Sequence, residues 1–231
     1  MDVCSKKKLP VSAQFEDFGT WIWLSMATKT RFILSCVIGH RCQGMADELV
    51  GKAKKKLNNV PLFVTDGLQF YKNALLKHYG KLVTYDRTGK PGRPKGPIVV
   101  ISELVNYAQV IKKRRDGKIT KVIKRVIFGS GIDPKLISTS YIERQNLTIR
   151  QDNNRISRKT IGFSKEKECL KDSIDLYLSK FNFCRKHRGL KYINEVGVTK
   201  YKCPAWAQGL TDHIWSLAEL LTYPYHKKTT N

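Results

Sequence analysis

The sequence predicts a mixed α/β fold, in which a sheet of antiparallel and parallel strands is flanked by helices. Two apolar, β-rich segments, 21–24 and 32–38, are joined by a short polar turn and predict adjacent antiparallel strands. Farther along, short strand-like segments alternate with segments of helical periodicity, which is typical of a sheet covered by helices. The chain has 231 residues, which suits one large domain or one domain with an appendage.

The elements that follow the first two strands can be placed in order. Apolar residues of 44–57 recur about every four positions and predict a helix. A short strand, 60–64, leads into Asp66, and residues 68–79 have helical periodicity again. Residues 81–85 predict one further strand.

A β-hairpin is predicted in the middle of the chain. Residues 86–98 are rich in glycine and proline and predict a loop. The segment 107–128 then has two strand-like arms around Asp116-Gly117, a pair suited to a tight turn. The arms carry Lys112, Lys113, Arg114, Arg115, Lys118, Lys121, Lys124 and Arg125. One interpretation is that these side chains only keep the hairpin solvated and soluble. The other is that the hairpin is a basic projection that lies along DNA.

The C-terminal third is expected to be helical. Residues 140–158 and 165–183 predict helices. We therefore expect a core over 1–160, with an insertion at about 86–135, and a helical C-terminal extension over 161–231.

Composition narrows the class of protein. Lys and Arg number 43 against 19 Asp and Glu, and the net charge of +24 favours binding to the phosphate backbone of nucleic acids. No apolar run approaches the roughly 18 residues of a membrane span, and the N-terminus lacks the apolar centre of a signal peptide. We expect a cytoplasmic protein. The six cysteines form no Cys-x-x-Cys pair, which predicts free buried thiols in a reducing compartment.

Asp66 is the strongest single candidate for a catalytic carboxylate. It follows the strand 60–64, and ligand sites of α/β sheets gather at such strand ends. Magnesium prefers hard oxygen ligands, and two such ions can assist phosphodiester chemistry. The alternative is structural, because Asp before Gly67 is also common in turns and helix caps.

Glu143 is the second candidate, and it also has a structural explanation. Ser140 and Glu143 have the spacing of a capping box, which needs no metal. However, Glu143 shares a helical face with Asn146, Leu147 and Arg150, and a polar face of this kind suits DNA. Three more basic residues extend it: Arg155, Arg158 and Lys159.

The remaining polar candidates are weaker from the residues alone. Asp2 lies at a chain end, where fraying is expected, and Glu16 and Asp17 lie in a loop-like polar run. Asp152 is expected to pair with a base of its own helix. His187 follows a predicted helix, and a lone histidine in such a place is usually structural or at the surface.

Several of these segments together resemble transposases of the insertion-sequence-one family, prokaryotic mobile elements with an Asp-Asp-Glu active site. The resemblance covers nearly the whole chain. Its parts, in order, are Trp21-Ile22-Trp23 with Thr30-Arg31, Thr65-Asp66-Gly67 with Tyr71, Thr139 to Arg150, Arg158-Lys159-Thr160 with Phe163-Ser164-Lys165, Asn182 to Arg185 with His187 and Leu190, and Pro204 to Trp215.

The resemblance implies an RNase H-like, retroviral-integrase-like fold and a DNA transposase that cleaves element ends and joins them to target DNA. It implies that Asp2, Asp66 and Glu143 hold two Mg²⁺ or Mn²⁺ ions. The implied partners are the terminal repeats of the element, target DNA and further copies of the chain, at the nucleoid of a prokaryotic cell. Expected DNA contacts are Asn146, Arg150, Arg155, Arg158, Lys159 and His187, with Lys112, Lys113, Arg114 and Arg115 of the hairpin.

The sequence departs from the family pattern at its start. Val3 stands where the family has a Glu after its first Asp, and Met1 itself can be aligned with that Asp. The family's N-terminal DNA-binding region is missing before this point, which predicts a truncated copy with weak activity. The alternatives are an inactive, basic DNA-binding protein and a nuclease of the same fold without strand transfer.

Overall fold

The computed structural model describes residues 20–84, 96–157, 161–162 and 164–224. Their contacts divide the chain into two compact units, which are described separately. The first unit extends to Leu24 and resumes over Ser35–Leu147, whereas the second comprises Ser25–Leu34 and the described residues from Thr148 onward.

A three-stranded sheet forms the centre of the first unit. Strand β3 (Leu62–Asp66) pairs in parallel with β6 (Asn106–Arg115), which pairs antiparallel with β7 (Lys118–Phe128). This mixed sheet with flanking helices confirms the α/β class. The predicted hairpin is also confirmed, since Asp116 and Gly117 have φ values of 51° and 77° in the turn between β6 and β7.

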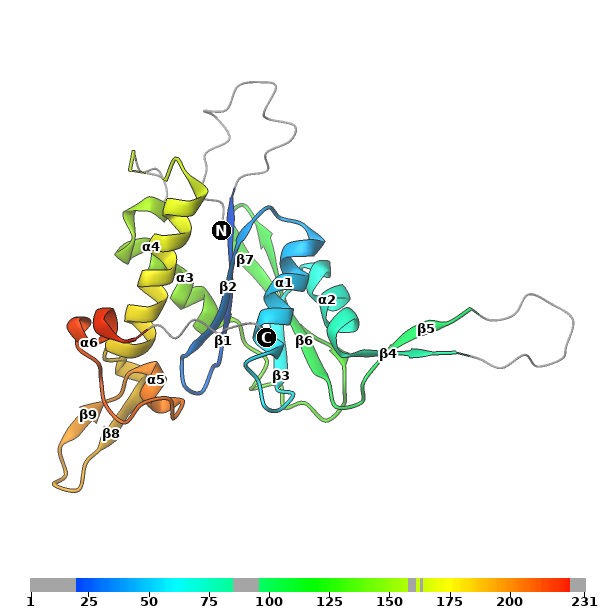
Figure 1. The fold of residues 1–231 in the computed structure, drawn as a ribbon. Helices are drawn as coiled ribbons and strands as arrows, with labels where there is room; N and C mark the ends of the chain where they lie inside the picture. The colour runs from blue at the N-terminus through cyan, green and yellow to red at the C-terminus, as the bar shows by residue number, and fades with distance from the viewer. Residues whose placement is uncertain (1–19, 85–95, 158–160, 163, 225–231) are drawn as a thin grey trace, which may run out of the picture. The chain divides into compact units, whose positions relative to one another are not determined.

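Two helices cover one face of this sheet. Helices α1 (Gln43–Lys54) and α2 (Gln69–Tyr79) confirm the two helices predicted from periodicity, and they lie side by side (Figure 1). Their buried residues pack around Tyr107 of β6, which is fully buried. The remaining buried members of this cluster are Trp23, Val37, Ala46, Leu49, Val50, Ala74 and Leu75.

The opposite face of the sheet has a core of its own. Ala108 and Val110 of β6 pack with Ile137, and Val64 of β3 lies against them. We call this side of the sheet the Val110 face. The segment around Ile137 leads directly into α3 (Ser140–Asp152), so the beginning of α3 is anchored on the Val110 face.

Two further strand pairs belong to the first part of the chain. The predicted pair at 21–24 and 32–38 is confirmed as β1 (Trp21–Met26) and β2 (Ile33–Gly39). Strand β4 (Gly80–Val83) pairs antiparallel with β5 (Ile98–Ile101). Strand β5 begins within the predicted loop 86–98, most of which lies outside the described residues.

The second unit is built on α4 (Lys167–Ser179), which continues as a π-helical turn, Lys180–Cys184. The side chain of Asn182 in this turn is buried and bonds both backbone groups of Ile33, accepting from N–H at 3.0 Å and donating to the carbonyl oxygen at 3.1 Å. Two short helices, α5 (Pro204–Ala207) and α6 (Leu217–Thr222), complete the helical part.

The C-terminal part, for which a helical extension is predicted, also contains a β-hairpin. Strands β8 (Lys191–Ile193) and β9 (Thr199–Tyr201) form an antiparallel pair. Each has three residues, which is shorter than the runs from which strands are inferred. The turn between them uses Gly197 with a φ of 76°. A short 3₁₀ turn, Arg188–Leu190, precedes this hairpin.

The predicted helix 140–158 is too long. Helix α3 ends at Asp152, and the side chain of Asn153 accepts a hydrogen bond from Arg155 N–H to cap a separate 3₁₀ turn, Asn154–Ile156. The prediction that Asp152 pairs with a base of its own helix is also wrong. Asp152 forms an ion pair with Arg185, which follows α4 in the chain.

Two other expectations concern the cysteines and the membrane. The cysteines that the structure describes are free thiols, but Cys42 and Cys169 are exposed, so burial holds for Cys203 and not for these two. None of the helices in the described ranges is both long and apolar enough to span a membrane.

Candidate active site

Asp66 is the last residue of β3 and is exposed. Its carboxylate accepts a hydrogen bond from the backbone N–H of Leu68 at 3.2 Å, which orients the side chain at the entry to α2. This contact is the one expected if Asp66 has a structural role in a turn. It engages Oδ1, and the carboxylate remains at the surface, where it can also bind a cation.

Glu143 lies in the first turn of α3 and is fixed by two side chains. Its Oε1 accepts a hydrogen bond from Thr139 Oγ1 at 2.7 Å. The ammonium group of Lys112 on β6 contacts Oε1 at 2.6 Å and Oε2 at 2.5 Å. Because α3 begins at Ser140, Glu143 lies one position beyond that of the capping-box acid, and its carboxylate instead faces Lys112.

The pKa of Glu143 reflects these contacts. Burial acts to raise the pKa of this carboxyl, but hydrogen bonds from Lys112 and Thr139, together with the charges of Lys112 and Arg114, outweigh it. The pKa of Glu143 is therefore lowered below its usual value. The carboxyl is held as an anion in contact with a cation, which is the state that a metal ligand requires.

Strand register relates Asp66 to Glu143. Residues paired across strands extend from the same face of a sheet, and alternate residues of one strand share a face. Asp66 is paired with Val110, and Lys112 lies two residues farther along β6. Asp66 and Lys112 therefore extend from the Val110 face, and Glu143 contacts Lys112 there. That the two carboxylates lie close enough to share metal ions stays a prediction.

Two tyrosines lie within electrostatic reach of Asp66, Tyr107 buried and Tyr71 half-buried. Burial raises the pKa of Tyr71, and the negative charge of Asp66 raises it further. Burial also raises the pKa of Tyr107, to which Asp66 contributes in the same direction, while Tyr107 shares hydrogen bonds with Thr65 and Gln109. Both phenols therefore stay protonated at neutral pH.

The other predicted residues of the first unit lie on the hairpin and on α3. Lys113, Arg114 and Arg115 are exposed toward the end of β6, where a DNA backbone can reach them. Lys112 is different, because it is bound to Glu143. Asn146 is half-buried and lies one helical turn beyond Glu143.

The predicted residues of the second unit have varied surroundings. Arg155 is exposed, with a long contact to Ser164 Oγ at 3.5 Å, and Arg150 is half-buried. His187 has structural partners: Nδ1 accepts from Gly189 N–H at 3.1 Å, and its ring meets that of Phe181 edge to face. Burial first, then the charges of Arg31 and Arg185, lower the pKa of His187, so its ring is neutral near pH 7.

Three predicted residues, Asp2, Arg158 and Lys159, lie outside the described residues. Within the part of the chain that the structure describes, no group of three or more His, Cys, Asp or Glu side chains is arranged to hold a metal ion. Sequence reasoning missed Thr139 as the partner of Glu143, although its position immediately before α3 is a signal that could have identified it.

Comparison with known proteins bears on the segment around Glu143. Residues 122–184 match the IS1 transposase family, that is, the transposases of insertion sequence one. The match begins within β7, contains Glu143, Asn146 and Arg150, and ends at Cys184. No curated protein and no solved structure matches the chain significantly. Over residues 122–184 the family match confirms the resemblance found in the sequence, and it supports an IS1-like transposase.

Proposed function

We propose that this chain is a metal-dependent DNA transposase that cleaves the ends of an insertion sequence and joins them to target DNA. One observation carries the proposal: Glu143, inside the segment that matches IS1 transposases, meets Lys112 on the sheet face from which Asp66 extends. We further infer an RNase H-like core, because a mixed sheet with one acid at a strand end and another on a helix is an arrangement suited to this chemistry.

The residues present fit divalent magnesium or manganese. Both candidates offer carboxylate oxygens, the hard ligands that these ions prefer. The fit is supported by the ammonium group of Lys112, a cation in contact with both oxygens of Glu143. The side chain of Glu143 is 48% exposed, so an ion from solvent can reach it. Asp2 would complete the set that the sequence predicts.

Each residue has a role in this proposal. Two bound ions would activate the attacking oxygen and stabilise the leaving oxygen of the phosphodiester. Leu68 N–H holds Oδ1 of Asp66, and Thr139 holds Oε1 of Glu143, so each carboxylate keeps one orientation. Lys112 neutralises Glu143 before an ion binds. The exposed bases of β6 would bind DNA phosphates and position the strand.

The test is a strand-transfer assay with a pre-cut element end and a plasmid, in Mg²⁺ and in Mn²⁺. We expect Asp66→Asn and Glu143→Gln each to reduce joining more than about 100-fold, because losing a metal ligand costs more than losing a group that orients one. The matched control is Glu48→Gln, an exposed acid on α1 whose partner is Lys52.

The alternatives give different outcomes in the same assay. Cutting without joining, lost in both variants, would indicate a nuclease. Binding of DNA with no metal-dependent product would indicate a DNA-binding protein without catalysis. Equal activity of wild type and Asp66→Asn would overturn the assignment of this site. Electron paramagnetic resonance measures the concentration of free Mn²⁺ and so tests ion binding independently of activity.

A further inference from the structure

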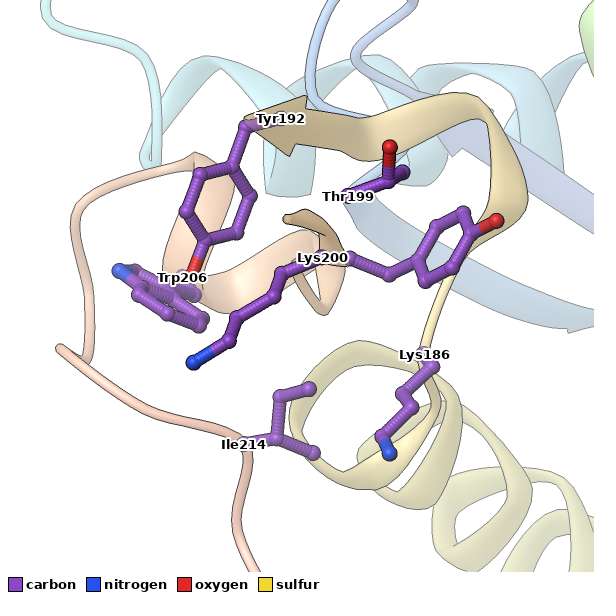
Figure 2. A pocket seen from close by; sticks show the side chains of 7 residues that line it. Lys186, Tyr192, Thr199, Lys200, Trp206 and Ile214 are labelled. Atoms are coloured by element: carbon purple, nitrogen blue, oxygen red, sulfur yellow. The ribbon is translucent and has the colours of Figure 1, made fainter. Parts of the chain in front are cut away.

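A cavity in the second unit combines aromatic and basic side chains, and we call it the aromatic pocket. Its volume is about 390 Å³, within the range of small-ligand sites. It lies between the β8–β9 hairpin, α5 and the segments before β8 and after α5 (Figure 2). The lining residues are Lys186, Tyr192, Thr199, Lys200, Tyr201, Trp206 and Ile214.

The two central rings are held by the fold. Tyr192 and Trp206 meet edge to face, with ring centroids 5.7 Å apart and an interplanar angle of 74°. Trp206 belongs to α5, whose neighbouring residues Cys203 and Ala205 are fully buried against Phe32. Because α5 is anchored in this way, the rings form a wall of fixed geometry.

Positive charge surrounds these rings. Lys200 is paired with Tyr192 across the hairpin and extends into the pocket toward Trp206, while Lys186 approaches from the segment before β8 (Figure 2). Lys202 lies over both rings, with its ammonium nitrogen 5.1 Å from each centroid, without lining the cavity. No acid is among the lining residues. The pocket therefore suits a ligand that is flat and negatively charged.

We propose that the aromatic pocket binds an unpaired nucleotide of a DNA strand, with its base against Tyr192 and Trp206 and its flanking phosphates on Lys186 and Lys200. Aromatic platforms combined with basic side chains are how proteins hold single strands, because each base has a π-face and each nucleotide has a phosphate. A base inside a duplex is covered by its neighbours and cannot reach the rings. The pocket thus takes DNA as an unpaired strand, whereas the hairpin of the first unit suits a backbone of either form.

This assignment takes DNA as the partner from the proposed function, but it concerns residues distant in sequence from Asp66 and Glu143. Binding at the pocket requires no metal ion. Failure of catalysis and failure of base binding can therefore be observed separately.

The experiment compares two labelled strands of equal length, oligothymidylate and the same backbone with abasic sites, by fluorescence anisotropy in EDTA. We expect wild type to bind oligothymidylate about 5- to 100-fold more tightly, since stacking on an aromatic ring contributes this much per base. Tyr192→Leu should reduce the difference, because only Trp206 remains to contact the base, and Tyr192→Phe, which keeps the ring, should retain it. Asp66→Asn should also retain it.

Three further variants separate the contribution of stacking from that of charge and from general effects of substitution in β8. Lys200→Ala should weaken the binding of both DNA strands equally. Lys171→Ala, which removes a lysine of α4 outside the pocket, should weaken the binding of each strand less than Lys200→Ala does. Ile193→Ala, beside Tyr192 and 73% exposed, should behave as wild type. If the wild-type protein binds the two strands equally, that result alone would overturn the proposal. So would a base preference that is unchanged in Tyr192→Leu, or tighter binding of the matching RNA strand.

Discussion

Two lysine–carboxylate pairs in the first unit have similar contact distances but different surroundings. Lys112 meets Glu143 where β6 approaches α3, and Lys77 meets Asp47 where α2 packs on α1, at 2.5 Å and 2.8 Å. In both cases the pKa of the carboxyl is lowered despite the opposing effect of burial. Charge pairing alone therefore does not distinguish a reactive acid from a structural one.

The difference lies in what else surrounds each acid. The side chain of Asp47 is 16% exposed, and its carboxylate also accepts a hydrogen bond from Gln43 at 2.7 Å. Gln43 in turn bonds Asn73 and the backbone of Phe70, so the network joins the two helices. Glu143 is 48% exposed and its cation comes from a hairpin. We call the Asp47 pair closed, because its carboxylate is shielded from solvent, and the Glu143 pair open, because its carboxylate is accessible to solvent.

The largest expected effect concerns the bases of β6 that are not paired with Glu143. Neutralising Lys113, Arg114 and Arg115 together should lower the slope of log affinity against log salt by about 2 to 3, since each phosphate contact on duplex DNA contributes about 0.9. Adding Lys112→Ala should change the slope little further, because Lys112 is bound to Glu143. The measurement is anisotropy of labelled duplex over a salt series. An unchanged slope in the triple variant would mean that these basic side chains only solvate the hairpin and do not contact DNA.

The next effect should fall on stability at the closed pair. Asp47→Ala removes the acceptor of Lys77 and Gln43, so we expect it to lower the free energy of unfolding by about 1–2 kcal/mol. Its neighbour Glu48 forms an exposed pair with Lys52, and Glu48→Gln should cost less than about 0.5 kcal/mol. Urea unfolding measures both. Equal losses in the two variants would show that the network around Asp47 contributes nothing special.

A smaller effect should appear in ion binding at the open pair. Lys112→Met keeps the aliphatic stem but removes the competing charge, so we expect Mn²⁺ affinity to rise about 2- to 5-fold, in line with the strength of exposed ion pairs. Lys77→Met is the matched control and should leave Mn²⁺ affinity unchanged. Electron paramagnetic resonance of free Mn²⁺ reports both. Weaker ion binding after Lys112→Met would show that the lysine supports the site and does not compete for it.

Local chemistry explains which parts of the fold could be predicted from sequence. The hairpin follows from Asp116-Gly117, whose positive φ values fix the turn, and α1 and α2 follow from apolar periodicity. The position of Asp66 at the end of β3 follows from the apolar run that precedes it. Each of these features is decided by residues that are close together in the chain.

Contacts between distant residues could not be predicted in the same way. Lys112 and Glu143 are 31 positions apart, and their pairing depends on how β6 meets α3. Asp152 meets Arg185 across 33 positions, where the sequence offered bases of its own helix as nearer partners. The aromatic pocket depends on β8 and β9, whose three-residue strands are stabilised by pairing and by α5 more than by their own propensity.

The smallest effect should be the acid dependence of the closed pair. Burial acts to raise the pKa of Asp47, but hydrogen bonds from Lys77 and Gln43 and the charges of Lys77 and His78 lower it below the usual 3.8. A carboxyl whose pKa is lower in the folded than in the unfolded chain stabilises the fold above the unfolded pKa, and this contribution is lost as pH falls through the folded pKa. Wild type should therefore lose its advantage over Asp47→Ala below about pH 4. Urea unfolding of both proteins between pH 7 and pH 3 measures the difference, with Glu48→Gln as the control that should follow wild type. A constant gap between wild type and Asp47→Ala down to pH 3 would mean that packing, and not the charge of Asp47, stabilises the contact between α1 and α2.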